Sequence, residues 1–348
     1  MILSVMVISH NQAHLIKRCL DSILRQCISA PWEIVISDDA STDSTWEIIQ
    51  DYATKYTESK KDGAWYQPII RAYQINSSDY KPTVTSDRCA ANKANVYMHA
   101  RGKYCVNIDA DDYLLGNDIY EYQINQLEDH PECSVSVQNI WYQNDGESLE
   151  QGHPWHYKEV WQENEVIDIV DYCKQRLCIS NPAFVMRRDT NLNPLDRYGL
   201  LFDDPIISTH HIIQGKIICT QKAQYVYVQY GNSIWNQVGK TTDDMLLRIL
   251  SGLIIYLRYF PNFKHLFLEV EIYNWIKTLK KLLLKHSPLQ MSLLTKKYID
   301  RLDNFGINKI IYLNKFYIFI LLCVSWIISK TDQYNGILAK MWYWIIKE

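Results

Sequence analysis

Three carboxylates stand together in "CVNIDADDYLL", residues 105–115. Asp109, Asp111 and Asp112 follow an apolar run that is typical of the end of a buried β-strand. Like charges this close repel one another unless a positive charge lies among them. An all-oxygen set suits a hard divalent cation, Mg²⁺ or Mn²⁺, and is poor for zinc, which prefers histidine and cysteine. We therefore interpret the segment as a candidate metal site, where the cation would neutralise a polyphosphate.

Two further acidic pairs occur elsewhere in the chain. "EIVISDDAST" places Asp38 and Asp39 directly after another strand-like run, and "GLLFDDPIISTHHIIQ" contains Asp203 and Asp204. Carboxylates at the carboxyl ends of parallel strands lie where open α/β sheets bind ligands. An acidic pair can also simply cap a helix, and that interpretation stays open for both pairs. Three acidic groups in one chain nevertheless favour a common binding crevice.

The sequence contains no glycine-rich phosphate loop. Neither a P-loop nor G-x-G-x-x-G is present, and the turn after the first expected strand is "SHNQAH". A phosphate would then have to be held by the metal, by side chains and by helix ends. Arg88 and Lys93, on the helix expected before residue 104, are the nearest basic candidates. The alternative is that both are ordinary solvated helix charges.

The elements that must position these residues follow an alternating pattern. From residue 1 to about residue 230, short apolar runs alternate with amphipathic ones, which indicates an α/β fold with a mostly parallel sheet flanked by helices. "STWE" predicts a capping box, formed by Ser44 and Glu47, at the start of the second helix. The expected strands are 3–8, 33–36, 68–73, 104–108, 133–141 and 183–188, and the expected helices are 13–26, 45–56, 87–99 and 119–129.

The C-terminal part differs in composition. Beyond residue 241, apolar and Lys/Arg-containing segments with helical spacing predict a helical region, 241–348, appended to a domain at 1–240. Residues 316–329 are uncharged, but they are fewer than the roughly 20 residues that a membrane-spanning helix needs. Aromatic residues beside lysines at 342–344 are typical of a membrane interface. Association with a membrane surface, packing on the protein's own core and homo-oligomer formation all stay open.

Composition excludes some classes of partner and location. The net charge of −3 at pH 7 gives no basic field for binding nucleic acid. The nine cysteines, an odd number with no CxxC pair, indicate a reducing compartment. The N-terminal apolar stretch has no basic region before it and no small-residue cleavage site after it, so we interpret it as a strand. We expect a cytoplasmic protein, either free or peripheral on the inner face of the cell membrane.

Three segments carry a family resemblance. They are "SVMVISHNQAHLIKRCLDSILRQ", "WEIVISDDASTDSTWEII" and "RCAANKANVYMHARGKYCVNIDADD", which together resemble the N-terminal half of the inverting family 2 glycosyltransferases with the GT-A fold. The resemblance is close over residues 1–115, loose over 116–233 and absent from the C-terminal helices. It implies a nucleotide-sugar half at 1–115 and an acceptor half at 116–240.

The resemblance also implies which residues bind the donor. Asp39, with Asp38 beside it, falls where the family recognises the uracil ring of a UDP-sugar. Asp109-Ala110-Asp111 falls on the DxD motif, which holds the metal and the donor's ribose and diphosphate, with Asp112 as the neighbouring carboxylate. The other positions implied in the donor site are the turn Ser9, His10 and Asn11 and the R-x-x-x-N pair Arg88 and Asn92.

For catalysis, the resemblance points to the third acidic pair. Asp203 and Asp204 match an acidic pair at the start of a helix that supplies the family's catalytic base. Inversion needs one carboxylate to deprotonate the acceptor hydroxyl as it attacks the anomeric carbon from the face opposite the leaving diphosphate. We assign this role to Asp204.

One segment departs from the family pattern. Many members have Tyr-Arg-x-His before a Gly-Asn-Ser-like turn, and its histidine can complete the metal shell; here Val228 and Tyr230 stand at the Arg and His positions. His210 and His211 are possible substitutes, with a surface or internally bonded histidine pair as the alternative. No Q-x-x-R-W motif of processive members is visible, which favours transfer of a single sugar.

The resemblance therefore implies an inverting, metal-dependent enzyme. It would move one sugar from a nucleotide sugar, expected to be UDP-linked, to a hydroxyl of a glycan or lipid-linked acceptor, as in surface polysaccharide synthesis. Two alternatives stay open. A sugar nucleotidyltransferase would use a similar sheet but begins with a Gly-rich loop that "SHNQAHLIKR" lacks. A non-catalytic glycan-binding or scaffold protein on the same fold would show metal-dependent binding of UDP without turnover.

Overall fold

A computed structural model describes residues 1–81, 85–154, 161–174, 183–230 and 259–263. The chain divides into two compact units, Met1–Ser233 and Ile234–Glu348. Of the second unit, the described part contains one short helical turn, η7, Pro261–Phe263. The apolar segment 316–329, the aromatic residues at 342–344 and the expected boundary after residue 240 lie outside the described residues. Within the described ranges, no helix combines the length and the apolar character needed to cross a bilayer.

The first unit is built on an eight-stranded sheet of order β11-β13-β8-β12-β6-β1-β2-β5. Its parallel core consists of β5, β2, β1 and β6, in that spatial order. In this core, Ile8 of β1 pairs with Asp109 of β6, and Ser9 pairs with Asp38 of β2. The first two acidic groups therefore end β6 and β2, the strands on either side of β1, at the same edge of the sheet, as the sequence predicted. The bounds are β1 Leu3–Ser9, β2 Glu33–Asp39, β5 Ile69–Ile75 and β6 Tyr104–Asp109.

The predicted strand over residues 133–141 is in fact two strands. β8 ends at Val137 and β9 begins at Ile140, and the two belong to different sheets. Gln138 and Asn139 lie between them, and Gln138 Oε1 accepts hydrogen bonds from the backbone N–H groups of Gln224 and Tyr225 at 3.0 and 3.1 Å. A side chain thus takes the place of a ladder bond, and the chain passes into the second sheet, β10-β9-β14-β7.

The remaining strands complete both sheets and a small hairpin. β12 pairs antiparallel with β6 and β8, and β13 pairs parallel with β8. In the second sheet, β14 lies between β9 and β7. The bounds are β3 Lys61–Asp62, β4 Trp65–Tyr66, β7 Tyr113–Leu114, β8 Cys133–Val137, β9 Ile140–Asn144, β10 His153–Pro154, β11 Val166–Ile167, β12 Phe184–Arg187, β13 Lys216–Cys219 and β14 Tyr225–Gln229.

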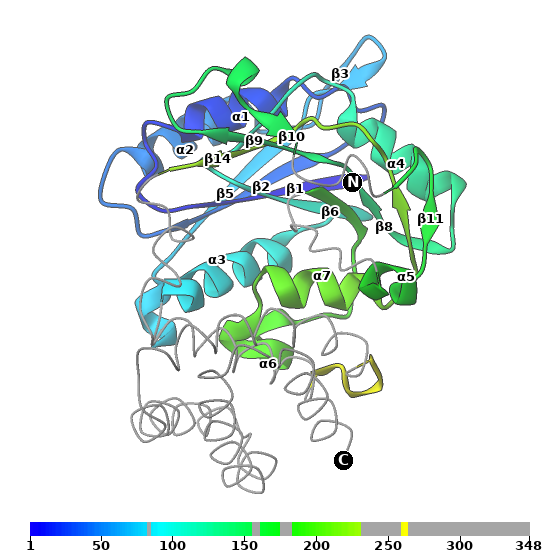
Figure 1. Ribbon diagram of the computed structural model, residues 1–348. Coiled ribbons are helices and arrows are strands. Elements are labelled where there is room, and N and C mark those ends of the chain that lie inside the picture. The colour runs from blue at the N-terminus through cyan, green and yellow to red at the C-terminus, as the bar shows by residue number, and fades with distance from the viewer. Residues whose placement is uncertain (82–84, 155–160, 175–182, 231–258, 264–348) are drawn as a thin grey trace, which may run out of the picture. The chain divides into compact units, whose positions relative to one another are not determined.

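Helices cover both faces of the large sheet. Figure 1 shows α1 and α2 on one face and α3 and α7 on the other. The bounds are α1 Ile16–Leu24, α2 Thr45–Lys55, α3 Thr85–His99, α4 Ile119–Asp129, α5 Ile169–Lys174, α6 Pro194–Tyr198 and α7 Asp204–Ile212. This arrangement confirms the predicted α/β class with a mostly parallel sheet.

The predicted capping box at α2 is wrong. Ser44 occupies the N-cap position but makes no side-chain capping bond. Instead, the Asp43 carboxylate accepts from the backbone N–H of Thr45 at 3.0 Å and from its hydroxyl. A carboxylate two residues away satisfies the orphan amide equally well, because the first helical N–H groups need only some acceptor.

A buried polar network fixes the opposite edge of the parallel core. The Glu33 carboxylate, which is fully buried, accepts from Ser4 Oγ at 2.6 Å and from Arg71 Nη2 at 2.8 Å. Gly102 N–H donates to Ser4 Oγ at 2.8 Å, and a Cβ at Gly102 would lie 2.5 Å from Ser4 N. Only glycine lets the lead into β6 approach β1 this closely. The network therefore holds in place the strands whose other ends carry the acidic groups.

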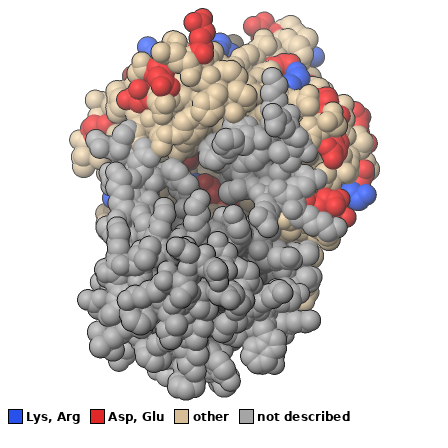
Figure 2. All heavy atoms as spheres, in the orientation of Figure 1, with Lys and Arg blue, Asp and Glu red and all other residues tan. Residues whose placement is uncertain are grey.

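Charges on the visible face of the described part are mixed. On the face shown in Figure 2, basic side chains are scattered among acidic ones and form no continuous field.

Candidate active site

The three carboxylates of the acidic turn come together at the end of β6. Ligand oxygens of Asp109, Asp111 and Asp112 all lie within 4.8 Å of one another. The N–H of Asp112 donates to the Asp109 carbonyl at 3.0 Å, which closes the turn. Burial raises the pKa of Asp109 to about 7; Lys93 acts against this shift, and neighbouring carboxylates add to it. Burial also raises the pKa values of Asp111 and Asp112. A cation bound at this turn would relieve the repulsion.

The carboxylates of the turn differ in their hydrogen-bond partners. Asp112 is 1% exposed; its Oδ1 accepts from the Val228 N–H at 2.9 Å, and its Oδ2 accepts from the Tyr225 hydroxyl. Both partners belong to β14, so Asp112 ties the turn to the second sheet. Asp109 Oδ1 is buried and has no hydrogen-bond partner among the described residues. An orphaned buried carboxylate oxygen is costly, and Asp109 and Asp111 are therefore the members suited to hold a cation.

A positive charge reaches the turn from α1. Arg18 Nη2 donates to the Asp111 carbonyl oxygen at 2.8 Å and to the Tyr230 hydroxyl at 2.9 Å. Its guanidinium lies over the Tyr113 ring, 4.5 Å from the ring centroid. The sequence had not singled out Arg18. The available signal was its place in the first turn of the helix that follows β1, because that turn begins at the ligand-binding edge of the sheet.

The predicted base pair is held by a buried lysine. Lys93 of α3 is 5% exposed on its side chain; its Nζ lies 2.7 Å from Asp203 Oδ1 and also contacts Asp204 Oδ1. Burial alone would lower the pKa of Lys93, but Asp203, Asp204 and Asp109 together hold it well above its usual value. The interpretation of Lys93 as a solvated helix charge is therefore wrong. The ammonium is internal because it neutralises carboxylates from a helix that begins about 110 residues later.

The capping interpretation of Asp203 and Asp204 also differs from the structure. Asp203 occupies the N-cap position of α7, but its side chain makes no capping bond. Its backbone carbonyl accepts from the N–H groups of Ile206 and Ile207 at 2.9 and 3.0 Å. The carboxylates of the pair are thus engaged with Lys93, while backbone bonds begin the helix.

The second strand end pairs a carboxylate with Arg88. Asp39 is 3% exposed, and its Oδ2 lies 2.7 Å from Arg88 Nη2. Ser77 donates to the same carboxylate through its N–H and its hydroxyl, both at 2.8 Å. Arg88, with 37% of its side chain exposed, is therefore already paired and is not a free phosphate ligand. The structure brings together Asp39 and Arg88, two of the residues predicted for donor binding.

Other predicted donor residues join two loops through hydrogen bonds. Asp38 is fully buried and accepts from Ser9 Oγ at 3.0 Å and from Ser41 N–H at 2.9 Å. Asn11, in the left-handed region at φ 53°, accepts from the Thr42 N–H at 2.8 Å. These bonds join the loop after β1 to the loop after β2.

His10 and Asn92 flank these loops. His10 is exposed, and its Nδ1 lies 2.7 Å from the Asp39 carbonyl oxygen. Asn92 Nδ2 donates to the Ser9 carbonyl at 3.1 Å, and its buried Oδ1 has no partner among the described residues. All the predicted donor residues therefore lie at the carboxyl edge of the parallel core or on α3 beside it.

The histidine pair is bonded internally. His210 Nδ1 lies 2.8 Å from the Tyr198 hydroxyl, and its Nε2 lies 3.1 Å from Asp189 Oδ2. His211 Nδ1 lies 2.8 Å from the Ile207 carbonyl, and its Nε2 lies 3.3 Å from the Tyr97 hydroxyl. Burial lowers the pKa of both rings, that of His211 to about 3. Because every ring nitrogen has a partner, neither histidine is placed to complete a metal shell.

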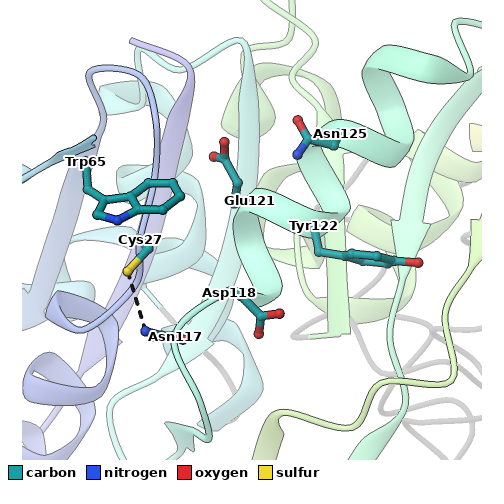
Figure 3. A pocket seen from close by; sticks show the side chains of 7 residues that line it. All are labelled: Cys27, Trp65, Asn117, Asp118, Glu121, Tyr122 and Asn125. Carbon is teal, nitrogen blue, oxygen red and sulfur yellow. Dashed lines mark hydrogen bonds between the residues drawn. The ribbon is translucent and has the colours of Figure 1, made fainter. Parts of the chain in front are cut away.

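A separate pocket of about 360 Å³ contains none of the predicted site residues (Figure 3). It lies between the segments that carry Cys27 and Trp65 and the N-terminal part of α4. Its carboxylates already have partners, since Asp118 pairs with Lys222 at 2.6 Å and Glu121 accepts from the Ser29 N–H at 3.2 Å. The lining residues are Cys27, Trp65, Asn117, Asp118, Glu121, Tyr122 and Asn125.

Comparison with known families identifies the family of this chain. The sequence model of glycosyl transferase family 2 matches residues 4–191, more than half of the chain. The chain belongs to glycosyl transferase family 2. The match covers β1 to β12 and therefore the acidic turn, Asp39, Arg88 and Lys93; Asp203, Asp204 and Tyr230 lie beyond it.

Two curated relatives illustrate the range of this family. An uncharacterised protein of Mycobacterium tuberculosis is 27% identical over 243 residues, which cover 67% of this chain and 60% of that protein. The chain thus spans 60% of the length of this mycobacterial relative. The poly(ribitol-phosphate) beta-glucosyltransferase of Bacillus spizizenii is 30% identical over 113 residues, or 32% of this chain and 15% of that enzyme.

Solved structures share the fold of this chain. TarS residues 1–349 of S. aureus in complex with UDP aligns with a TM-score of 0.53 at 15% identity, covering 96% of this chain and 93% of that one. The same protein in complex with UDP-GlcNAc gives a TM-score of 0.52 at 15% identity, with coverages of 88% and 89%. These likenesses confirm the predicted GT-A type of sheet.

Proposed function

We propose that the protein is an inverting, metal-dependent glycosyltransferase that moves one sugar from a UDP-sugar to a hydroxyl of a glycan or lipid-linked acceptor. The observation that carries this proposal is the clustering of Asp109 and Asp111 at the carboxyl edge of β6 in a family 2 chain. Support for the donor comes from TarS, which was solved with UDP and with UDP-GlcNAc. The name of the Bacillus spizizenii relative supports a role in polysaccharide synthesis.

The acidic turn fits a divalent cation. Its donor atoms are all carboxylate oxygens, and the buried Asp109 Oδ1 has no partner among the described residues. Such a set suits Mn²⁺ or Mg²⁺. Asp109 and Asp111 would hold the ion, while Asp112 keeps the turn oriented through its bonds to β14. When bound, the ion would neutralise charge on the donor diphosphate.

Asp204 is our candidate for the catalytic base. Its side chain is 40% exposed, so an acceptor hydroxyl can reach it from solution. Lys93 holds Asp203 and Asp204 together, and both carboxylates contribute to the raised pKa of Asp109. Proton removal and donor binding would thus occur in one electrostatic environment. In such a site, catalysis is mainly positioning and charge stabilisation.

The nucleotide end of the donor would lie along the loops after β1 and β2. Asp39 is buried and bonded, whereas its partner Arg88 is more exposed. We propose that Asp39 and Arg88 recognise the uracil ring as a unit, in which the carboxylate orients the guanidinium. His10, exposed beside Asp39, would contact the nucleotide from the other loop.

The test is a donor screen with the full chain. Protein, MnCl₂ and each of a panel of nucleotide sugars are incubated, and free nucleotide is measured. We expect release of UDP from one UDP-sugar and loss of this activity with EDTA. Asp204→Asn should lower the rate about 10²-fold or more, as removal of a general base does. Asp111→Asn should also lower the rate, because it removes a ligand of the cation that would neutralise the diphosphate. Asp118→Asn, in the separate pocket, should retain the parental rate.

Three results would contradict the proposal. Release of nucleotide at the parental rate by Asp111→Asn or Asp204→Asn would refute the site assignment. Metal-dependent binding of UDP with no turnover of any UDP-sugar would favour the scaffold function. Retention of the anomeric configuration in the product, followed by NMR, would refute inversion.

A further inference from the structure

Arg18 is not among the donor-binding residues that the family resemblance implied. We propose that Arg18, held by Tyr230, is the cationic side chain that binds the donor's diphosphate beside the acidic turn. This inference rests on the proposed function, because it identifies a further ligand of the same donor. Tyr230 acts in it as a positioning residue.

The guanidinium of Arg18 is fixed from three sides by neutral groups. Its Nη2 donates to the Asp111 carbonyl at 2.8 Å and to the Tyr230 hydroxyl at 2.9 Å. The Tyr113 ring lies against its plane, 4.5 Å from the ring centroid to Cζ. An arginine held by a carbonyl, a hydroxyl and an aromatic face keeps its full charge, and its planar fork is preorganised for a phosphate.

The remaining donors of Arg18 are available. Within the described ranges, Nε and Nη1 have no hydrogen-bond acceptor, and Arg18 pairs with no carboxylate. The side chain is exposed, so a ligand in solution can reach it. The two basic residues that the sequence suggested as phosphate ligands are instead paired with carboxylates. Arg88 is paired with Asp39 at 2.7 Å, and Lys93 is buried against Asp203 at 2.7 Å.

Charge balance at the turn requires a further cation. Three carboxylates meet there, and the diphosphate of a nucleotide sugar adds more negative charge. One divalent ion offsets only part of this total, and the excess grows as the nucleotide diphosphate leaves. Arg18 supplies a fixed positive charge on the backbone side of Asp111. A preorganised charge of this kind costs no reorganisation during the reaction.

Tyr230 explains why the guanidinium stays beside the turn. It follows β14, the strand that also carries both hydrogen-bond partners of Asp112. Its hydroxyl accepts from Arg18, and so links the end of β14 to α1 across the acidic turn. Loss of this hydroxyl removes one of two bonds to Nη2 but leaves the charge in place. Its effect should therefore be smaller than that of removing the guanidinium.

The test is nucleotide binding by the full chain, measured by isothermal titration calorimetry in MnCl₂ with UDP and with uridine. Arg18→Gln should weaken UDP binding about 10-fold to 100-fold, the range expected for a hydrogen bond to a charged group. Tyr230→Phe should weaken it about 3-fold to 10-fold by the same reasoning. Uridine, which lacks phosphate, should bind all variants alike. Lys17→Gln, which removes the exposed neighbouring charge on α1, should leave both affinities unchanged.

The outcomes separate this inference from the proposed function. If the parent chain binds UDP and Arg18→Gln binds it equally well, Arg18 does not contact the diphosphate, although the proposed function stands. If Arg18→Gln loses uridine and UDP binding in parallel, its role is structural and the inference is wrong. If the parent binds no nucleotide with Mn²⁺ or Mg²⁺, the proposed function fails, and this inference fails with it.

Discussion

Replacing Lys93 by methionine removes a buried ammonium and keeps most of its volume. The side chain is 5% exposed and contacts carboxylates that are 32% and 40% exposed, those of Asp203 and Asp204. Breaking a fully buried ion pair costs about 3–5 kcal/mol. Because water can solvate part of both carboxylates, we expect a smaller loss in the free energy of unfolding, about 2–3 kcal/mol.

The assay is urea unfolding followed by tryptophan fluorescence, with a thermal melt beside it. For a folded unit of this size, 1 kcal/mol corresponds to roughly 2–4 °C, so the melting temperature should fall by about 4–12 °C. The matched control is Lys103→Met. Lys103 pairs with Glu128, and their side chains are 50% and 42% exposed. An exposed pair contributes about 0–1 kcal/mol.

The double variant Lys93→Met/Asp203→Asn isolates the pair itself. If the ammonium and the carboxylate stabilise each other, the combined loss should differ from the sum of the single losses by about 0.5–3 kcal/mol. The reasoning is refuted if Lys93→Met loses no more stability than Lys103→Met, or if the cycle shows no coupling. Either result would mean that the buried contact contributes no more than a surface pair.

Two further predictions concern stability. His211 has a folded pKa of about 3 against its usual 6.5, so only the unfolded state takes up its proton as the pH falls below 6.5. The contribution of His211 to the free energy of unfolding should therefore fall by about 2 kcal/mol from pH 7 to pH 5. In His211→Gln the free energy of unfolding should depend less steeply on pH, and a slope equal to that of the parent would contradict the assignment. Gly102→Ala should lower the unfolding free energy by about 1–3 kcal/mol in urea titrations, because its Cβ would lie 2.5 Å from Ser4 N; a wild-type midpoint would contradict this.

The parallel core was predictable because its pattern is local. The strands β1, β2, β5 and β6 are apolar runs bounded by polar turns, and each starts within one residue of its expected position. The ends were less predictable. β2 continues to Asp39, whereas the sequence indicated an end at Ile36. Ser37, Asp38 and Asp39 look like a turn in the sequence, but all three are buried, with bonded side chains.

The pairings within the site could not be predicted locally. Lys93 meets Asp203 across 110 positions, and Arg18 meets Tyr230 across 212. No periodicity encodes such contacts, because they depend on which strand ends become neighbours. The acidic positions themselves were recoverable, since a carboxylate after an apolar strand is visible in the sequence. Their partners were not, and for this reason the sequence did not single out Arg18 and left Lys93 open between a phosphate ligand and a solvated helix charge.

The distribution of partners distinguishes the three acidic groups. Asp39 is neutralised by Arg88, and Asp203 and Asp204 share Lys93. At the turn of Asp109 and Asp111, the described residues place no lysine or arginine in an ion pair with either carboxylate; Arg18 contacts the backbone there instead. Burial raises the pKa of Asp109 to about 7, even though the nearby Lys93 acts to lower it. At the other two groups the protein supplies its own counter-charge, which holds Asp39 and Asp204 in place for the roles that we propose. Where it does not, a bound cation would supply the counter-charge. This difference supports our proposal that the end of β6 holds the cation and the diphosphate of the donor.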